Sequence, residues 1–200
     1  RTVVNLFGKD GNCEDVSKWN LWQTTNALDT TNKVFGSSGT KVTLTNTLGN
    51  QYKLLSTLDN TKHYCLSGYI KNGNASPGAR IYMNTTGGTG NVFNLTSFIT
   101  DNIKFTRVSL KVKPSDWGTG YTIMEVGFQV SGTVGQYAYV DGLMLEEITQ
   151  EQYDDPNFEP SPYVDSYACL QNPYIEVRHD NLVRNGNAEE GIAWWSVNKS

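Results

Sequence analysis

The chain has 200 residues, of which 18% are charged, and its formal net charge is −4. This length is enough for one domain with a sizeable core. The acidic balance and the lack of a basic cluster argue against nucleic acid as a partner. No apolar run approaches the roughly 18 residues that span a bilayer, which argues against membrane insertion. We expect the sequence to be a piece of a longer protein.

The opening motif of the chain recurs near its end. Residues 11–14 read Gly-Asn-Cys-Glu, with Trp19 five positions after the Glu, and residues 186–189 read Gly-Asn-Ala-Glu, with Trp194 at the same distance. An Asn-Leu pair precedes both copies. Chance is the alternative, because these residue types are common. Tandem modules are typical of binding or scaffolding arrays, since repeated weak sites give avidity.

We therefore divide the chain into three parts. Residues 1–148 are interpreted as one β-sandwich module, and residues 149–180 as an extended, proline-containing and acidic segment with a linker. Residues 181–200 are interpreted as the start of a second, related module.

Short runs of period-two alternation follow one another along the first part. They lie at 41–45, 64–70, 80–84, 106–113, 124–130 and 137–145. In the fourth run, Val108, Leu110 and Val112 alternate with polar or charged residues. Such alternation indicates antiparallel strands with one face in the core. Many short strands with Gly-rich connections predict an all-β sandwich or barrel.

The pattern of alternating residues ends after the last of these runs. Thr149 is placed to cap a single helical turn. Pro156, Pro160 and Pro162 then break regular structure. We expect this segment to leave the sandwich and to run along its surface.

The opening and closing motifs resemble those of carbohydrate-binding modules of the family four and nine type. The resemblance lies in Asn5-Leu6, in residues 11–19, and in the run 138–145, where Asp141 follows an aliphatic residue. It implies a jelly-roll β-sandwich of two antiparallel sheets. The sequence departs from the family pattern at Cys13, where the family usually has Phe.

A second resemblance concerns the end of the module. Residues 143–147 followed by 158–163 are similar to the ends of such modules in bacteriophage tail and minor structural proteins, with Met144 in place of a Gln and Ile148 in place of a Gly. The resemblance implies a phage tail fibre or a bacterial surface protein, and hence an extracellular or virion location. A homo-oligomer within a fibre is a further possibility.

The family resemblance also implies a structural calcium ion (Ca2+). Related modules use the opening Glu and the Asp of the closing strand, which correspond here to Glu14 and Asp141. The loop from Ser37 to Thr40 is the predicted source of backbone ligands. Hard cations prefer such carboxylate and carbonyl oxygens. The alternative is that Glu14 accepts turn amides and that Asp141 pairs with a Lys or Arg.

Glycan binding requires aromatic side chains flanked by polar groups, because sugar rings present apolar faces. Trp19 matches the family Trp and is predicted to lie in the core. Trp22 and Trp117 are predicted to be exposed, the latter because it lies in a Gly-rich loop. The alternative for Trp117 is a lid that packs over the end of the sandwich. The remaining candidates are predicted to share a glycan-binding sheet face, with Glu125 beside them: Arg80, Tyr82, Gln129, Tyr137 and Tyr139.

The sequence contains no recognisable catalytic motif. Glu146 and Glu147 are adjacent, and neighbours on a strand point to opposite faces, so they do not form an acid/base pair. The hypothesis is a non-catalytic module that adheres to a surface polysaccharide or cell-wall glycan. Two alternatives stay open: a structural spacer or oligomerisation module without a ligand, and a binding module appended to a glycoside hydrolase.

Overall fold

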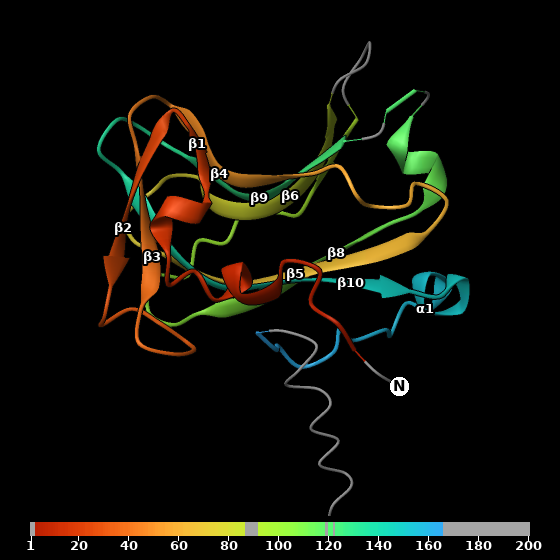
Figure 1. Cartoon of the computed structure of the whole chain (residues 1–200). Coiled ribbons are helices and arrows are strands. Elements are labelled where there is room, and N and C mark those ends of the chain that lie inside the picture. The colour runs from red at the N-terminus through yellow and green to blue at the C-terminus, as the bar shows by residue number, and fades with distance from the viewer. Residues whose placement is uncertain (1–2, 87–91, 119, 122, 166–200) are drawn as a thin grey trace, which may run out of the picture.

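A computed structural model describes residues 3–86, 92–118, 120–121 and 123–165. These residues form two five-stranded antiparallel sheets packed face to face, which confirms the predicted jelly-roll sandwich (Figure 1). The proposed second module at 181–200 and the linker residues 166–180 lie outside the described residues.

The first sheet has the strand order β1-β4-β9-β6-β7. Its strands are β1 (Asn20–Trp22), β4 (Leu48–Leu55), β9 (Ile123–Ser131), β6 (Gly78–Thr86) and β7 (Phe93–Leu95). The second sheet has the order β2-β3-β10-β5-β8. Its strands are β2 (Thr24–Asp29), β3 (Gly39–Leu44), β10 (Tyr137–Ile148), β5 (His63–Asn72) and β8 (Thr106–Val112). The six predicted runs fall on β3, β5, β6, β8, β9 and β10.

The core lies between the two sheets, because most strands have one apolar face and direct it toward the opposite sheet. Ile81 and Phe128 of the first sheet are buried, as are Leu66 and Leu145 of the second. Trp19 is also in the core, as predicted, with its ring centroid 6.3 Å from that of Phe128. Burial of these alternating side chains is the main favourable term for the fold.

Among the described residues, helical structure is confined to short segments: the 3-10 turns η1 (Gly8–Asn12), η2 (Val16–Lys18) and η3 (Pro114–Trp117), and the helix α1 (Gln150–Asp154). Thr149 caps α1 as predicted, because its hydroxyl accepts a hydrogen bond of 3.2 Å from the amide of Gln152. Within the described part of the chain, no helix is long and apolar enough to cross a membrane.

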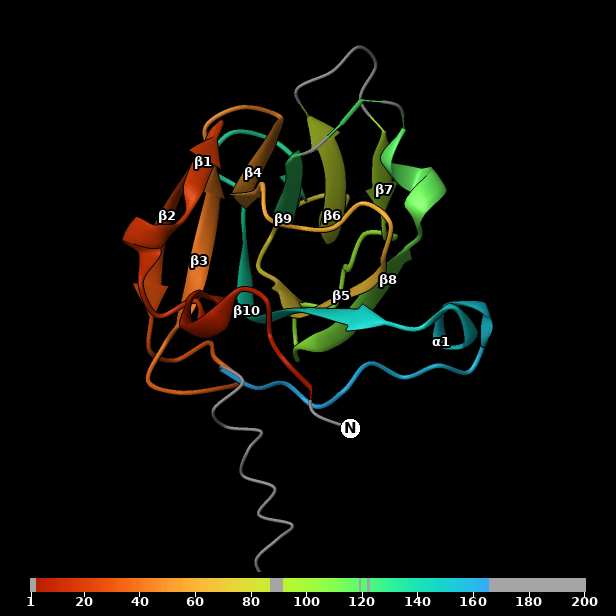
Figure 2. The ribbon, with the colours of Figure 1, turned by 45° about the vertical axis from the view of Figure 1, so that its right-hand side comes forward.

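Residues 155–165, here called the strap, return from α1 across the outer face of the second sheet (Figure 2). Arg107 of β8 donates hydrogen bonds to the carbonyls of Pro160 and Ser161. Glu146 of β10 accepts from the Ser161 amide at 2.8 Å. At the far end, Tyr163 stacks on Phe35 with 4.4 Å between ring centroids. The strap therefore covers part of one outer sheet face.

Candidate functional site

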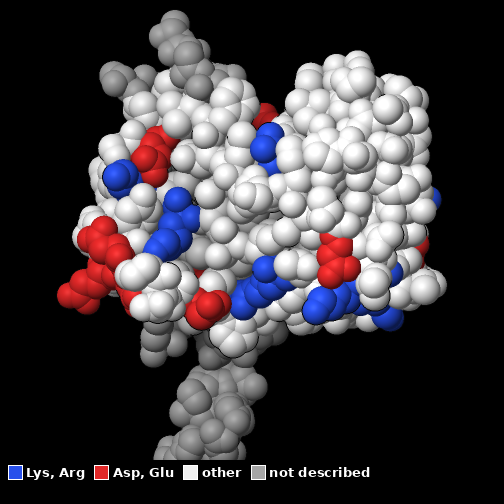
Figure 3. Space-filling model, turned by 180° about the vertical axis from the view of Figure 1, so that it is seen from behind, with Lys and Arg blue, Asp and Glu red and all other residues white. Residues whose placement is uncertain are grey.

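The outer face of the first sheet is hollow and polar. The strand register aligns Trp22, Asn50, Gln129 and Arg80 in one row across β1, β4, β9 and β6. Figure 3 shows the molecule from behind, with a notch at the top between two raised ends. We call this surface the groove. Its residues are Trp22, Asn50, Tyr52, Arg80, Tyr82, Glu125 and Gln129.

One chain of hydrogen bonds runs along the floor of the groove. Arg80 donates through Nε and Nη2 to Gln129 Oε1, at 2.9 and 2.6 Å. Gln129 donates to Asn50 Oδ1 at 3.1 Å, and Asn50 donates to Glu125 Oε1 at 3.4 Å. The Tyr82 hydroxyl donates to the same carboxylate oxygen. Each polar group thus fixes the orientation of its neighbour.

The electrostatics of the groove keep its phenols neutral. Burial, and then the charge of Glu125, raise the pKa of Tyr82 well above its ordinary value. The same two causes raise the pKa of Tyr52. Burial lowers the pKa of Arg80, whose guanidinium lies 4.2 Å from the centroid of the Phe98 ring. Both phenols therefore keep their hydroxyl protons at neutral pH.

Apolar side chains border the polar floor. Trp22 is 45% exposed at the β1 edge, which confirms its predicted exposure. Phe93, at the opposite edge on β7, is 56% exposed and pairs across the strands with Asn84. Between them, a Cβ on Gly127 would lie 2.1 Å from the Gln51 carbonyl oxygen, so glycine lets β4 and β9 approach closely. A polar floor between aromatic edges is suited to an elongated, hydroxyl-rich ligand.

The structure corrects the prediction for Tyr82. It lies on the same sheet face as Arg80 and Gln129, as predicted, but it is 1% exposed. It pairs in the strand register with Gly127 on one side and Leu95 on the other, and its hydroxyl donates a hydrogen bond to Glu125. It therefore supports the floor of the groove rather than standing in solvent.

The predicted exposure of Trp117 is wrong. Its side chain is 1% exposed and belongs to the core, with its ring centroid 6.4 Å from that of Tyr64. The 3-10 turn η3 folds the indole back into the sandwich. Pro114 in the first turn, and Asp116 accepting a 3.0 Å bond from the Lys113 amide, are the local signals for that turn.

The structure separates Tyr137 and Tyr139 from the groove, so the predicted neighbourhood with Gln129 and Glu125 is wrong. Both tyrosines lie on β10, which pairs with β3 and β5 in the second sheet. Alternation within a strand predicts which residues share a side, but it does not indicate to which sheet the strand belongs.

The sequence reasoning missed Asn50 and Tyr52 in the groove, and Phe93 at its edge. The first two lie on β4, whose segment has polar side chains on both faces and so lacks clear alternation. Gln51, for example, is fully buried and accepts a hydrogen bond from Asn26 at 3.1 Å. Phe93 lies on a strand of three residues, too short for a periodic signal.

The predicted calcium ligands gather around the loop between β2 and β3. Glu14 Oε1 accepts from the Ser37 and Ser38 amides. Asp141 Oδ2 accepts from the amides of Val34 and Phe35, the former at 2.6 Å. The two carboxylates therefore converge on one loop, and backbone amides bind both of them.

The pKa values of these two carboxyl groups are shifted in opposite directions. Hydrogen bonds from Ser37 lower the pKa of Glu14. Burial, opposed by three backbone amides, raises the pKa of Asp141, and the charge of Glu14 raises it further. Of the two predicted loop ligands, Thr40 donates to the Cys13 carbonyl at 2.7 Å, and the Ser37 carbonyl accepts from the Lys33 ammonium at 3.0 Å.

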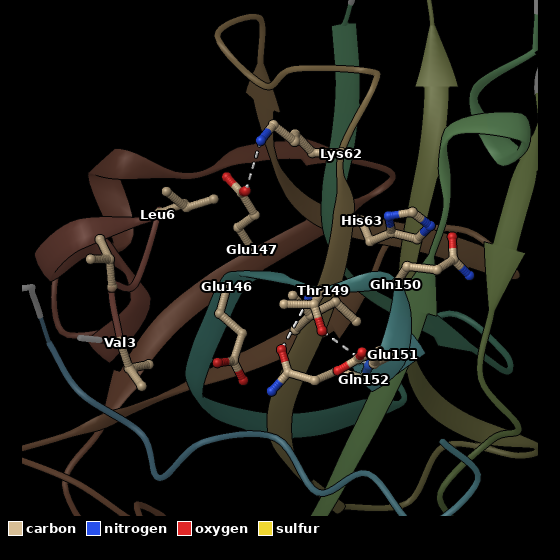
Figure 4. Close-up of a pocket in the computed structure, with 12 residues that line it drawn as sticks. Val3, Leu6, Lys62, His63, Glu146, Glu147, Thr149, Gln150, Glu151 and Gln152 are labelled. Atoms are coloured by element: carbon tan, nitrogen blue, oxygen red, sulfur yellow. Dashed lines mark hydrogen bonds and ion pairs between the residues drawn. The ribbon is translucent and has the colours of Figure 1, made fainter. Parts of the chain in front are cut away.

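Among the described residues, two of the cavities lie outside the groove. One of about 920 Å3 lies between the N-terminal segment and the end of β10 (Figure 4). Two charged residues of its lining, Lys62 and Glu147, form an ion pair at 3.3 Å. The other, of about 300 Å3, is lined by Glu14, Phe35, Tyr163 and Asp165 among others. Neither cavity contains a predicted glycan-binding residue.

No protein-family model matches the chain, and no curated protein does. Solved structures do match in fold. A Stig cyclase, Fisc, from Fischerella sp. TAU has a TM-score of 0.55 at 14% identity, over 74% of this chain and 98% of that one. The CBM22-1 xylan-binding domain of Xyn10C from Paenibacillus barcinonensis has a TM-score of 0.52 at 11% identity. That match covers 66% of this chain and 86% of the xylan-binding domain.

The enzymatically active domain of tailspike protein 4 from bacteriophage CBA120 has a TM-score of 0.51 at 15% identity. That match covers 69% of this chain but 20% of the tailspike chain. At these identities the likenesses show the fold alone. The chain has a jelly-roll fold that carbohydrate-binding modules also have, and the same fold occurs in a cyclase.

Proposed function

We propose that this chain is a non-catalytic carbohydrate-binding module, and that the groove on the first sheet binds the glycan. The observation that carries the proposal is the continuous hydrogen-bonded floor of Arg80, Gln129, Asn50, Glu125 and Tyr82. The xylan-binding domain with the same fold supports it.

The floor is chemically suited to sugar hydroxyls. An arginine has five N–H donors, and the bonds to Gln129 leave others for a ligand. Trp22, at the rim, offers an apolar surface for a sugar ring. Because the floor is already ordered by its own hydrogen bonds, binding costs less conformational entropy than it would in a mobile site.

The groove is proposed to bind without catalysis. Glycoside hydrolysis ordinarily uses two carboxylates that flank the scissile bond. Among the described residues that form the groove, Glu125 is the single carboxylate, and Tyr82 and Asn50 both donate to it. Such a carboxylate is suited to accepting hydrogen bonds from a ligand.

The biological setting is part of the proposal. We propose a surface polysaccharide or cell-wall glycan as the ligand, and a phage tail fibre or bacterial surface protein as the setting, hence an extracellular or virion location. The resemblance of residues 143–147 and 158–163 to phage tail modules supports this setting.

A binding screen tests the proposal. The protein is titrated with bacterial cell-wall polysaccharides and with plant β-glucans and xylan, with calcium present. Binding that Arg80→Ala weakens by about tenfold or more supports the groove, since one charge-assisted hydrogen bond contributes at least that much. Lys18→Ala, an exposed site elsewhere, is the matched control.

The panel also separates the alternatives. Binding to cell-wall glycans supports surface adhesion, whereas binding to plant glycans alone favours a module appended to a glycoside hydrolase. A well-folded protein that binds neither panel contradicts the proposal and favours a structural spacer.

We further propose a structural calcium ion between Glu14 and Asp141. The donor set is of the kind that calcium prefers, and the Ser37 carbonyl lies on the same loop. Glu14 also lines the 300 Å3 cavity, together with Asp165. A bound cation would offset the repulsion between the carboxylates and would replace the Lys33 ammonium at Ser37.

Chelation tests the calcium proposal. A bound ion stabilises the folded state by mass action, so EDTA should lower the melting temperature by several degrees. Asp141→Ala should remove that sensitivity. An unchanged melting curve would contradict the calcium site. The role of the two carboxylates would then be to accept hydrogen bonds from the backbone amides of the loop.

A further inference from the structure

The outer face of the second sheet carries a group of aromatic and cationic side chains that the groove does not include. Tyr139 of β10 lies directly between Lys41 of β3 and Lys71 of β5 in the strand register. Tyr137, two residues earlier, lies on the same side of β10. We call these four half-buried residues the lysine–tyrosine patch.

The tyrosine rings hold the two ammonium groups in place. Lys41 Nζ lies 3.8 Å from the centroid of the Tyr137 ring, and Lys71 Nζ lies 5.9 Å from that of Tyr139. The rings themselves meet edge to face, with centroids 5.5 Å apart. Cation–π contact orients a lysine without neutralising it.

The charges of Lys41 and Lys71 interact with those of Asp29 and Asp101, respectively. Among the described residues, neither Lys41 nor Lys71 forms a salt bridge, and the Lys71 ammonium donates to the neutral Asn32 Oδ1 at 2.9 Å. An ammonium has three donors, and the contacts described above leave some of them available.

The nearby carboxylates are directed toward their own loops. Asp29 accepts from the amides of Thr31 and Asn32, at 2.9 and 2.7 Å. Asp101 accepts from the Ile103 amide at 2.8 Å. Each acid therefore stabilises a turn and interacts with its lysine through charge rather than through a salt bridge, so the ammonium donors stay available to another anion.

We propose that the lysine–tyrosine patch is a second glycan-binding site, specific for an anionic sugar chain. The fixed ammonium groups would bind the acidic groups of the ligand, and the phenol rings and hydroxyls would contact its sugar rings. The patch lies on the opposite side of the sandwich from the groove, so one module would contact two glycan chains. This inference does not depend on binding in the groove.

The test measures binding of the intact protein to polygalacturonate, a carboxylated glycan, and to dextran sulfate, a sulfated one, by isothermal titration calorimetry at low and moderate salt. The double variant K41A/K71A should weaken binding by about tenfold or more. K9A/K18A removes the same charge at two exposed sites and should change the affinity less than about twofold. Unchanged melting temperatures show that both variants are folded.

The outcomes distinguish this patch from the groove and from attraction to charge alone. Whichever of the two polymers binds identifies the acidic group. Binding that Arg80→Ala leaves intact keeps this site distinct from the groove, whether or not the groove binds a neutral glycan. Equal losses in the two double variants, equal binding to poly-L-glutamate, or no binding to either acidic glycan would overturn the proposal.

Discussion

The outer faces of the two sheets differ, although each sheet consists of five antiparallel strands. The first sheet leaves its face hollow, with a hydrogen-bonded polar floor between β1 and β7. The second sheet has part of its face covered by the strap, which Arg107 and Glu146 hold through Ser161. A free face with ordered polar groups is available to a ligand, whereas a covered face adds stability.

The comparison also explains why the same residue types serve different purposes. Arg80 in the groove binds a neighbouring side-chain amide and keeps donors available. Arg107 under the strap binds the backbone carbonyls of Pro160 and Ser161, and the Ser67 hydroxyl. The partners of each guanidinium, rather than its residue type, indicate whether it belongs to a site or to the fold.

The largest expected effect concerns the aromatic residue that belongs to the core. Trp117→Ala should destabilise the fold by about 3–5 kcal/mol, because it leaves a large cavity beside Tyr64. Trp22→Ala, at the groove rim, should change stability by about 0.5 kcal/mol or less but weaken glycan binding. Chemical denaturation measures both. If the Trp117→Ala variant is as stable as the wild type, the placement of Trp117 in the core is contradicted.

The next effect concerns the strap. Arg107→Ala should cost about 1.5–3 kcal/mol, because it removes charge-assisted bonds to Pro160 and Ser161. Limited proteolysis should then cut within residues 155–165, while affinity in the groove stays the same. Lys104→Ala, exposed near the same strand, is the control. If stability and the cleavage pattern do not change, the strap is not held by Arg107.

The smallest effect is the pH dependence at the loop between β2 and β3. The pKa of Glu14 is lowered below its ordinary value of 4.5, so its contribution to stability is present above that pH and is lost as the pH falls through the folded-state pKa. The contribution of Asp141 to stability changes with pH in the opposite direction. Its pKa is raised, so its ionised form is the one that costs free energy in the folded state.

Glu14→Gln should therefore lower stability at pH 7 by about 1 kcal/mol, the usual contribution of a hydrogen bond, and by less below pH 4.5. Thermal melts between pH 3 and 7 measure this difference. Glu159→Gln, at an exposed position of the strap, serves as the control. An equal loss at both ends of the pH range would contradict the ionised role of Glu14.

The fold could be predicted from the sequence because most strands alternate cleanly. Val108, Leu110 and Val112 fix the face of β8 without any knowledge of its neighbours. Strand β4 could not be found in this way, since Asn50 lies on the groove floor and Gln51 is buried on the other face. A strand that carries a binding site can lack the alternation of apolar and polar residues by which strands are predicted from sequence.

The site is predictable only in part, for a similar reason. Arg80 and Gln129 share a face because each strand alternates, and the register then brings them together. The position of Tyr139 depends on which strands flank β10, and this strand order arises from long-range pairing rather than from local sequence. The burial of Trp117 is hard to predict because its Gly-rich surroundings conceal a short helical turn.

The central claim is that the groove on the first sheet binds a glycan. NMR amide shifts, followed during titration with neutral oligosaccharides of the glycans in the screen, test it most directly. We predict that the largest changes fall on β4, β6 and β9, around Asn50, Arg80 and Gln129. Changes confined to the second sheet, or no changes with any of the oligosaccharides, would contradict it.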